Sequence, residues 1–278
     1  MIQISDTSVD INTLDQELPA SSLQRKILNR LAESQIVYNY PSLSLLKFEI
    51  KLRSSTVSAA RRLAVSGSEF AVFDKSKCNA AYWTRTDEGG FLLNQTATPS
   101  AGINDIFKSG WKYAFECTTS IVIVYYKALI DTIGAESFNN HFASLYLFDG
   151  TYDKHLHLIK TFAGQSDYLP GDALYFKNPE YNPETPEWQG ENVILLDNDT
   201  YFAHGIGIKT KKGVIASLNQ YRFAGATVSA FLVDEAVRPD FAYLAQFDLI
   251  TGERSAGVIA DGNTLVYAQI GPVIQIRP

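Results

Sequence analysis

The pattern of apolar residues changes near residue 150 of the 278-residue chain, and this change constrains the fold more than any other feature. Before it, apolar side chains recur at helical spacing over long segments. After it, short apolar runs are bounded by Gly, Asn, Asp or Pro: "GDALYFKN", "NVILLD", "TYFAHGIGIKT", "GVIASLN" and "SAFLVDEAV". Helices that precede the strands, and do not alternate with them, predict an α+β fold with segregated elements.

The segments before residue 150 predict several helices. A first helix starts near residues 21–22, and a long amphipathic helix starts at residues 41–42 and ends at Gly67. A shorter helix covers "ESFNNHFASLYLFD", and short strands are expected at "FAVFD" and "AAYWTRT". The first helix has an apolar stripe made of Leu23, Ile27 and Leu31.

Residues 117–134, "CTTSIVIVYYKALIDTIG", allow two readings. The β-branched interior suits a strand by local propensity. However, the run is long, Gly134 is a good helix stop, and a helix that is apolar on all sides is expected when it is fully buried. We therefore predict a buried helix that begins at Cys117.

Composition and charge exclude several classes of protein. A net charge of −6 and a pI of about 5.3 argue against an electrostatic nucleic-acid binder. The longest apolar run, residues 121–126, is too short to span a bilayer, and the first ten residues lack the features of a secretory signal. Two cysteines without a Cys-x-x-Cys pair form neither a disulfide scaffold nor a zinc motif. We expect a soluble intracellular protein.

Cys117 is the strongest candidate for chemistry. A thiol at a helix N-terminus is well placed to ionise, because the helix dipole and the free N–H groups stabilise a thiolate and can also bind an oxyanion. The alternative is a small buried residue without a chemical role, which free cysteine often is. Glu116 also allows two readings: an ionised carboxylate would raise the thiol pKa, or the same group could accept the thiol proton.

A cysteine nucleophile needs a base, and the chain has four histidines. His204 is the best candidate, because it lies in "YFAHGIGI", a strand that ends in glycines where a backbone can approach a ligand. His141 lies in a predicted helix and is expected to be a solvated or edge residue. His155 and His157 share one face of a predicted strand, "KHLHLIK", without a third ligand for a metal.

Glu191 opens the apolar strand "GENVILL", which the turn "DNDT" joins to the strand of His204. Antiparallel pairing of these strands would bring Glu191 close to His204. An exposed carboxylate at a strand edge is the alternative for Glu191.

Three segments together carry a resemblance to a known protein family. "YAFECTTSIVIVYYKALIDTIG", "GDALYFKNPEYNPETPEWQGENVILL" and "YFAHGIGI" closely resemble the transglutaminases of spore-forming bacilli, which cross-link spore-coat proteins. "FEIKLRSSTVSAARRLAVSGSEFAVF" is similar to the long N-terminal helix of that family. The resemblance runs from about residue 15 to about residue 238 in the expected order.

The resemblance implies a papain-like core, related to bacterial cell-wall cysteine peptidases, in a single domain. Residues 1–40 would form an N-terminal helical extension and residues 41–238 the catalytic core. Residues 239–278, with the turn signals "TGE" and "DGN", would form a C-terminal β extension. The implied site residues are Cys117 as nucleophile, Glu191 as base, Glu116 as a partial substitute for that base, His204 as an orienting polar residue, and Trp188 and Phe70 as walls of a narrow tunnel to the thiol.

The implied activity is acyl transfer that needs neither calcium nor a cofactor. It would join glutamine and lysine side chains of spore-coat proteins, in the cytoplasm of the sporulating mother cell and at the spore surface, with the enzyme acting as a monomer. Two alternatives are a cysteine peptidase or amidase of the same superfamily, and a non-catalytic coat protein that retains the fold.

Overall fold

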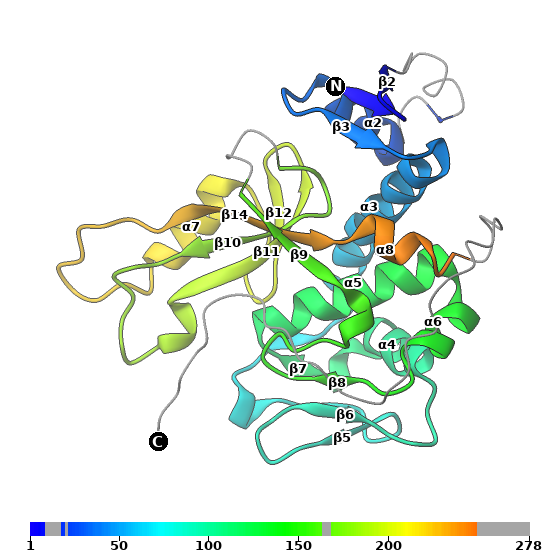
Figure 1. Ribbon diagram of the computed structural model, residues 1–278. Coiled ribbons are helices and arrows are strands. Elements are labelled where there is room, and N and C mark those ends of the chain that lie inside the picture. The colour runs from blue at the N-terminus through cyan, green and yellow to red at the C-terminus, as the bar shows by residue number, and fades with distance from the viewer. Residues whose placement is uncertain (9–17, 20–21, 163–167, 249–278) are drawn as a thin grey trace.

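The computed structural model describes residues 1–8, 18–19, 22–162 and 168–248 of the chain (Figure 1). Helices dominate the chain up to residue 141, and a large antiparallel sheet follows, which confirms the predicted α+β class. Figure 1 shows the N-terminal strands and the small β5–β6–β8 sheet at opposite ends of the molecule, with α3 and α5 between them. The helices of the described part are α2 (Leu23–Glu33), α3 (Leu43–Leu63), α4 (Pro99–Lys108), α5 (Cys117–Ile133), α6 (Ala135–His141), α7 (Lys211–Asn219) and α8 (Phe241–Ala245).

The helix starts follow the capping residues in the sequence. The hydroxyl oxygens of Ser22 and Ser42 accept hydrogen bonds from backbone N–H groups at the starts of α2 and α3, as the sequence predicts. The long helix ends at Leu63, four residues before Gly67, which has a φ of +87° in the turn that follows.

The helix predicted from Cys117 is confirmed as α5, Cys117–Ile133. Tertiary burial overrides the strand propensity of its β-branched residues, because all of its residues except Asp131 are buried. Gly134 ends the helix with a φ of +85°, a conformation that favours glycine. The result is an almost completely buried helix with Cys117 at its first turn.

Six strands form an antiparallel sheet in the order β13–β12–β11–β10–β14–β9. Four of the five strand segments predicted after residue 150 are confirmed, with "TYFAHGIGIKT" divided between β12 and β13, and so is the pairing of β11 with β12, in which Val193 lies opposite Ala203. The strands are β9 (Leu158–Thr161), β10 (Ala173–Lys177), β11 (Gly190–Asp197), β12 (Thr200–Ala203), β13 (Gly207–Lys209) and β14 (Phe231–Pro239).

The remaining strands of the described part are short. The N-terminal sheet has the order β2–β1–β3, and a second small sheet has the order β5–β6–β8. A two-stranded parallel pair, β4–β7, places Phe70 beside Phe115, just before α5. These strands are β1 (Ile2–Ile4), β2 (Thr7–Ser8), β3 (Tyr38–Tyr40), β4 (Glu69–Phe70), β5 (Trp83–Arg85), β6 (Phe91–Leu93), β7 (Ala114–Phe115) and β8 (Tyr146–Leu147).

The two faces of the large sheet belong to two separate hydrophobic clusters. Ile194, Leu196 and Phe202 pack with α3 and α5 in the larger cluster. Val193 and Leu195, on the alternate positions of β11, pack with α7 in the other cluster. Because successive side chains of a strand point to opposite faces, the even-numbered positions of β11 face α5.

A buried ion network joins α3 to the sheet. The guanidinium of Arg53 contacts the carboxylates of Glu49 and Asp172 at 2.7 Å each, and Arg238 contacts Asp172 at 2.6 Å. Two arginines and two carboxylates balance in charge, which makes their burial tolerable. The network fixes α3, and α5 packed against it, relative to the sheet.

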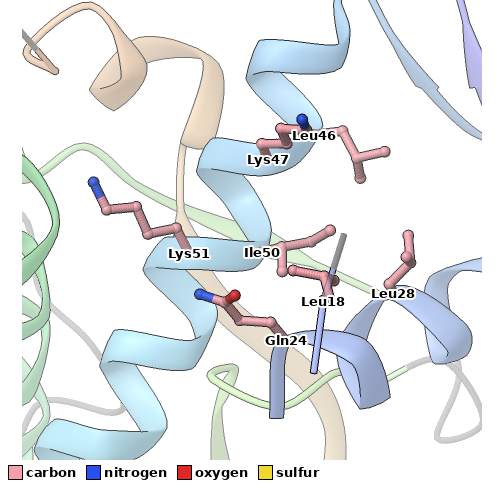
Figure 2. A pocket seen from close by; sticks show the side chains of 7 residues that line it. All are labelled: Leu18, Gln24, Leu28, Leu46, Lys47, Ile50 and Lys51. Carbon is pink, nitrogen blue, oxygen red and sulfur yellow. The ribbon is translucent and has the colours of Figure 1, made fainter. Parts of the chain in front are cut away.

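A groove lies between α2 and the N-terminal half of α3 (Figure 2). Leu28, Leu46 and Ile50 form its apolar floor, and Lys47 and Lys51 stand on its rim. Its volume is about 240 Å³. The groove is on the N-terminal side of the fold and does not include Cys117.

Three sequence predictions of local structure are wrong. "GVIASLN" forms helix α7 and not a strand, because Thr210 caps it and Val214 and Leu218 bury one helical face. The helix predicted over "ESFNNHFASLYLFD" ends at His141 and gives way to β8. "KHLHLIK" begins as a 3₁₀ turn, Lys154–Leu156, with His157 in the left-handed region, so the two histidines do not share a strand face.

Two further predictions differ in part. "FAVFD" contributes only Phe70 to β4 and continues as a 3₁₀ turn, Phe73–Lys75. The segment predicted as a C-terminal β extension begins, after the end of β14, with helix α8. The turns "TGE" and "DGN" lie outside the described residues.

Candidate active site

Cys117 lies at the first position of α5 and is only 8% exposed. Glu116 is the N-cap of this helix, and its carboxylate accepts hydrogen bonds from the N–H groups of Thr118 at 2.5 Å and Thr119 at 2.6 Å. The hydroxyl of Thr118 donates to the same carboxylate. Glu116 therefore binds the helix start, and the N–H groups of Thr118 and Thr119 are not free to hold an oxyanion.

Glu191 lies at the start of β11 and is 2% exposed. Among the residues that the structure describes, its Oε1 atom has no hydrogen-bond partner, which is rare for a buried carboxyl oxygen. Burial raises the pKa of Glu191 well above its ordinary value, and the nearby charge of Glu116 raises it further. The backbone of His204 offers a hydrogen bond that opposes this rise.

The Cys117 thiol responds to the same surroundings. Burial raises its pKa well above the ordinary value, and the carboxyls of Glu191 and Glu116 add to the rise. Asn192 opposes it through a side-chain and a backbone hydrogen bond. At neutral pH the thiol is thus protonated, next to a carboxyl group that holds its own proton more tightly than usual.

Asn192 is a site residue that the sequence reasoning missed. Its side-chain Nδ2 donates to the Sγ atom of Cys117 at 3.5 Å, and the residue is 5% exposed. The available signal was the pair of polar residues, Glu191 and Asn192, at the start of an otherwise apolar strand.

His204 lies beyond the end of β12 and is 4% exposed. Burial lowers the pKa of its imidazole to about 4, so the ring is neutral at physiological pH. Its Nε2 lies 3.1 Å from the carbonyl oxygen of Glu69, and its ring stacks on Phe115 at 4.5 Å. The neutral ring of His204 thus joins the large sheet to the β4–β7 pair. The backbone of His204 faces Glu191.

Aromatic side chains surround the approach to the thiol. Phe70 and Trp188 have ring centroids 5.9 Å apart, and Trp188 stacks on Tyr221 at 3.8 Å. A cavity of about 40 Å³ reaches Cys117; its walls are Phe70, Val72, Phe73, Glu116, Pro186 and Glu187. The structure thus brings Phe70 to the thiol and Trp188 against Phe70.

A second hollow lies on the side of Tyr175. This cleft of about 500 Å³ has Tyr175, Lys177, Tyr181 and Gln189 among its walls. Tyr175 lies opposite Asn192 in the β10–β11 ladder, and the charge of Cys117 contributes to the raised pKa of Tyr175. Tyr175 therefore lines this cleft and also pairs with the strand residue whose side chain contacts the thiol.

The other histidines lie apart from this arrangement. His155 pairs with Asp153 at 2.7 Å, His157 pairs with Asp240 at 3.0 Å, and His141 bonds the carbonyl oxygen of Ser137. Within the ranges that the structure describes, no group of three His, Cys, Asp or Glu side chains is arranged to hold a metal ion. None of the helices in those ranges has the length and apolarity needed to cross a bilayer.

The geometry defines a class of site. A buried thiol at a helix start, next to a carboxyl of raised pKa and lined by aromatic side chains, suits nucleophilic attack on a carbonyl followed by acyl transfer. Fold and site together suit an acyl-transfer enzyme, with Cys117 as the candidate nucleophile.

Comparison with known proteins narrows this class of enzyme to one family. The sequence model of the family "Protein-glutamine gamma-glutamyltransferase" matches residues 1–248. A curated relative of that name from Bacillus cereus strain G9842 is 40% identical over 98% of each chain. Another, from Bacillus licheniformis, is 44% identical over 83% of this chain and 93% of its own.

A solved structure agrees with the sequence comparison. The chain is similar to a transglutaminase from Geobacillus stearothermophilus, solved without its C-terminal extension, with a TM-score of 0.71 and 48% identity over 75% of this chain and 99% of that one. The chain belongs to the protein-glutamine γ-glutamyltransferase family.

Proposed function

We propose that the protein cross-links other proteins by forming ε-(γ-glutamyl)lysine isopeptide bonds, with Cys117 as nucleophile and Glu191 as base. The observation that carries the residue assignment is the buried Glu191 carboxyl, which has a raised pKa, an oxygen without a partner among the described residues, and a charge that acts on the Cys117 thiol. Family membership supports the type of reaction.

The first half-reaction would form a thioester. The Glu191 carboxylate takes the proton of the Cys117 thiol, and the thiolate attacks the γ-carboxamide carbon of a glutamine side chain. Collapse of the tetrahedral intermediate breaks the carbon–nitrogen bond, and the carboxylic acid returns the proton to the leaving ammonia. The products are a γ-glutamyl thioester on Cys117 and free ammonia.

The second half-reaction would transfer the acyl group. A neutral lysine ε-amine attacks the thioester carbon and gives a proton to the Glu191 carboxylate. The carbon–sulfur bond breaks, and the proton passes to the departing thiolate. Cys117 and Glu191 then return to their starting state, which closes the cycle without a further reagent.

Exclusion of water would decide between transfer and hydrolysis of the thioester. Phe70 and the neighbouring Trp188–Tyr221 stack form an apolar surround on the side of the small cavity. We assign Phe70 and Trp188 to the walls of a tunnel that admits side chains and keeps bulk water out. His204 would hold the strand of the base in place through its bond to Glu69.

The substrates we propose are proteins of the spore coat that carry accessible glutamine and lysine side chains. The enzyme would act as a monomer in the sporulating mother cell and at the spore surface, without calcium or another cofactor. This assignment rests on the resemblance to the enzymes of spore-forming bacilli and on relatives that come from Bacillus species.

The test compares Cys117→Ala with Cys78→Ala, since these are the two cysteines of the chain. Purified protein is incubated with a glutamine peptide and a lysine peptide, and both ammonia and the cross-linked product are measured. We expect Cys117→Ala to abolish both products and Cys78→Ala to retain them. Ammonia without cross-linking would indicate an amidase, and no reaction in the parent protein would favour a non-catalytic coat protein.

A further inference from the structure

Three N–H groups at the start of α5, those of Thr118, Thr119 and Ser120, are not available to the thiol. A helix start normally offers free N–H groups and a positive dipole end to a thiolate. Here the Glu116 carboxylate accepts the N–H groups of Thr118 and Thr119, and the Glu116 carbonyl accepts the N–H of Ser120. The carboxylate of Glu116 also offsets the positive potential at the helix N-terminus that would otherwise favour a thiolate. A thiolate at Cys117 therefore needs a hydrogen-bond donor from another element.

Asn192 on the neighbouring sheet is placed to be that donor. Its Nδ2 lies 3.5 Å from Sγ of Cys117, within range for a hydrogen bond to sulfur. The residue occupies an even-numbered position of β11, on the face that packs against α5 through Ile194 and Leu196. The ladder partner Tyr175 and the flanking Glu191 fix this position within the sheet.

We propose that Asn192 is a catalytic residue whose side-chain amide holds the Cys117 sulfur as a thiolate during the attack on glutamine. The inference rests on the proposed function and names the donor that the helix start lacks. The amide adds no charge to a buried site that already contains two carboxyl groups. The Nδ2–H group of Asn192 can stay bound to sulfur in both protonation states, because both the thiol and the thiolate sulfur can accept its hydrogen bond.

The ionisable groups around Sγ set the background for this bond. Glu116 comes from the cap of α5, Glu191 from β11 and Tyr175 from β10. Glu187, from the 3₁₀ turn Pro186–Trp188, lines the same cavity as the thiol. All of these groups are acidic and oppose a thiolate when ionised, whereas the Asn192 amide and backbone favour it.

The test measures ionisation of Cys117 directly, without a protein substrate. In a Cys78→Ser background, the alkylation rate of Cys117 by iodoacetamide is followed across pH for the parent, Asn192→Leu and Asn192→Ala. Leucine is close to asparagine in size but has no donor, and alanine serves if leucine perturbs folding. We expect both variants to raise the apparent pKa by about one unit, which slows alkylation about tenfold at pH values below the pKa.

Asn139→Ala is the matched control. Asn139 lies on α6, away from the site, and its Oδ1 accepts a hydrogen bond from Ser100 N at 2.8 Å. Its alkylation profile should coincide with that of the parent. If the profiles of Asn192→Leu and Asn192→Ala also coincide with the parent, the proposal is wrong.

The experiments can contradict the proposed function and the proposed role of Asn192 independently. Cross-linking that persists in Cys117→Ala would overturn the proposed function, while the alkylation profiles would still report whether Asn192 stabilises the thiolate. Conversely, unchanged profiles with cross-linking that depends on Cys117 would remove only the role of Asn192. A loss of cross-linking in Asn192→Leu with an unchanged profile also contradicts the proposal, since it would place the residue elsewhere in the reaction.

Discussion

Replacement of Glu191 by glutamine should remove the contribution of this carboxyl to the pH dependence of the free energy of unfolding. The same change removes the proposed base. The carboxyl is almost fully buried, and its pKa in the folded protein lies well above the ordinary value of 4.5. Between pH 4.5 and the raised pKa, the unfolded chain has lost this proton and the folded chain keeps it. The unfolded state therefore binds fewer protons, and the free energy of unfolding falls as pH rises.

The size of the effect follows from the proton count. One proton held only by the folded state changes the free energy of unfolding by about 1.4 kcal/mol for each pH unit. The stabilising contribution is fully present below pH 4.5 and is lost as pH rises toward the raised pKa. Glutamine has no proton to lose, so Glu191→Gln should gain stability relative to the parent by about this amount per unit across that window.

Urea denaturation at several pH values between 5 and 8 measures the difference. Glu88→Gln serves as control, because Glu88 is exposed. The free energy of unfolding of this variant should change with pH as it does in the parent protein. Ammonia release, which needs no amine acceptor, should fall about 100- to 10,000-fold in Glu191→Gln and not in the control. Parallel stability curves for the parent and Glu191→Gln would refute a protonated Glu191, whatever happens to activity.

Four further results are expected. Glu116→Gln should weaken the cap of α5 and lower stability by about 0.5–2 kcal/mol in urea denaturation, with a smaller loss of turnover than at the proposed base; an equal loss of turnover would contradict this order. Asp172→Asn should lower the free energy of unfolding by roughly 3–5 kcal/mol, because it leaves both buried arginines of the ion network without their shared carboxylate. An unchanged urea denaturation midpoint would contradict this stabilising role of Asp172. Gly190→Ala should reduce ammonia release sharply at nearly normal helix content by circular dichroism, because an added Cβ would lie 2.1 Å from the Tyr175 hydroxyl and displace the start of β11. Prior treatment with a calcium chelator should leave the cross-linking rate unchanged, and recovery on added calcium would contradict calcium independence.

The sequence alone predicts the parts of the fold that depend on long, consistent patterns. Helix α5 follows from a buried apolar run ended by Gly134, and the β11–β12 pair follows from two apolar runs around a short turn. These features place Cys117, and they place Glu191 near the backbone of His204. Local residue patterns suffice here because burial and turn chemistry favour the same structure.

Elements decided by tertiary contacts were beyond the sequence. Helix α7 is short and contains a glycine, so its identity depends on a Thr210 cap and on Val214 and Leu218, which pack against the sheet. The turn that carries His155 depends on Asp153, whose side chain accepts its N–H. Each of these signals covers only a few residues, so neither outweighs the local apolar run when the sequence is read alone.

The orientation of polar side chains was equally hidden. A carboxylate next to a cysteine can face the thiol or its own helix, and only the three-dimensional structure shows that Glu116 binds the helix start. Asn192 was passed over because asparagine in a strand carries no motif of its own. Its importance emerges only when α5 packs on the even-numbered face of β11.

The burial of Cys117 has a consequence for the lifetime of the protein. Peroxides attack thiolates far more readily than protonated thiols, and the first oxidation product, sulfenic acid, leads on to irreversible acids. Burial keeps Cys117 protonated and also raises the pKa of the half-buried Cys78 to about 11. Both sulfur atoms are thereby kept in the thiol form, which oxidants attack more slowly, at neutral pH.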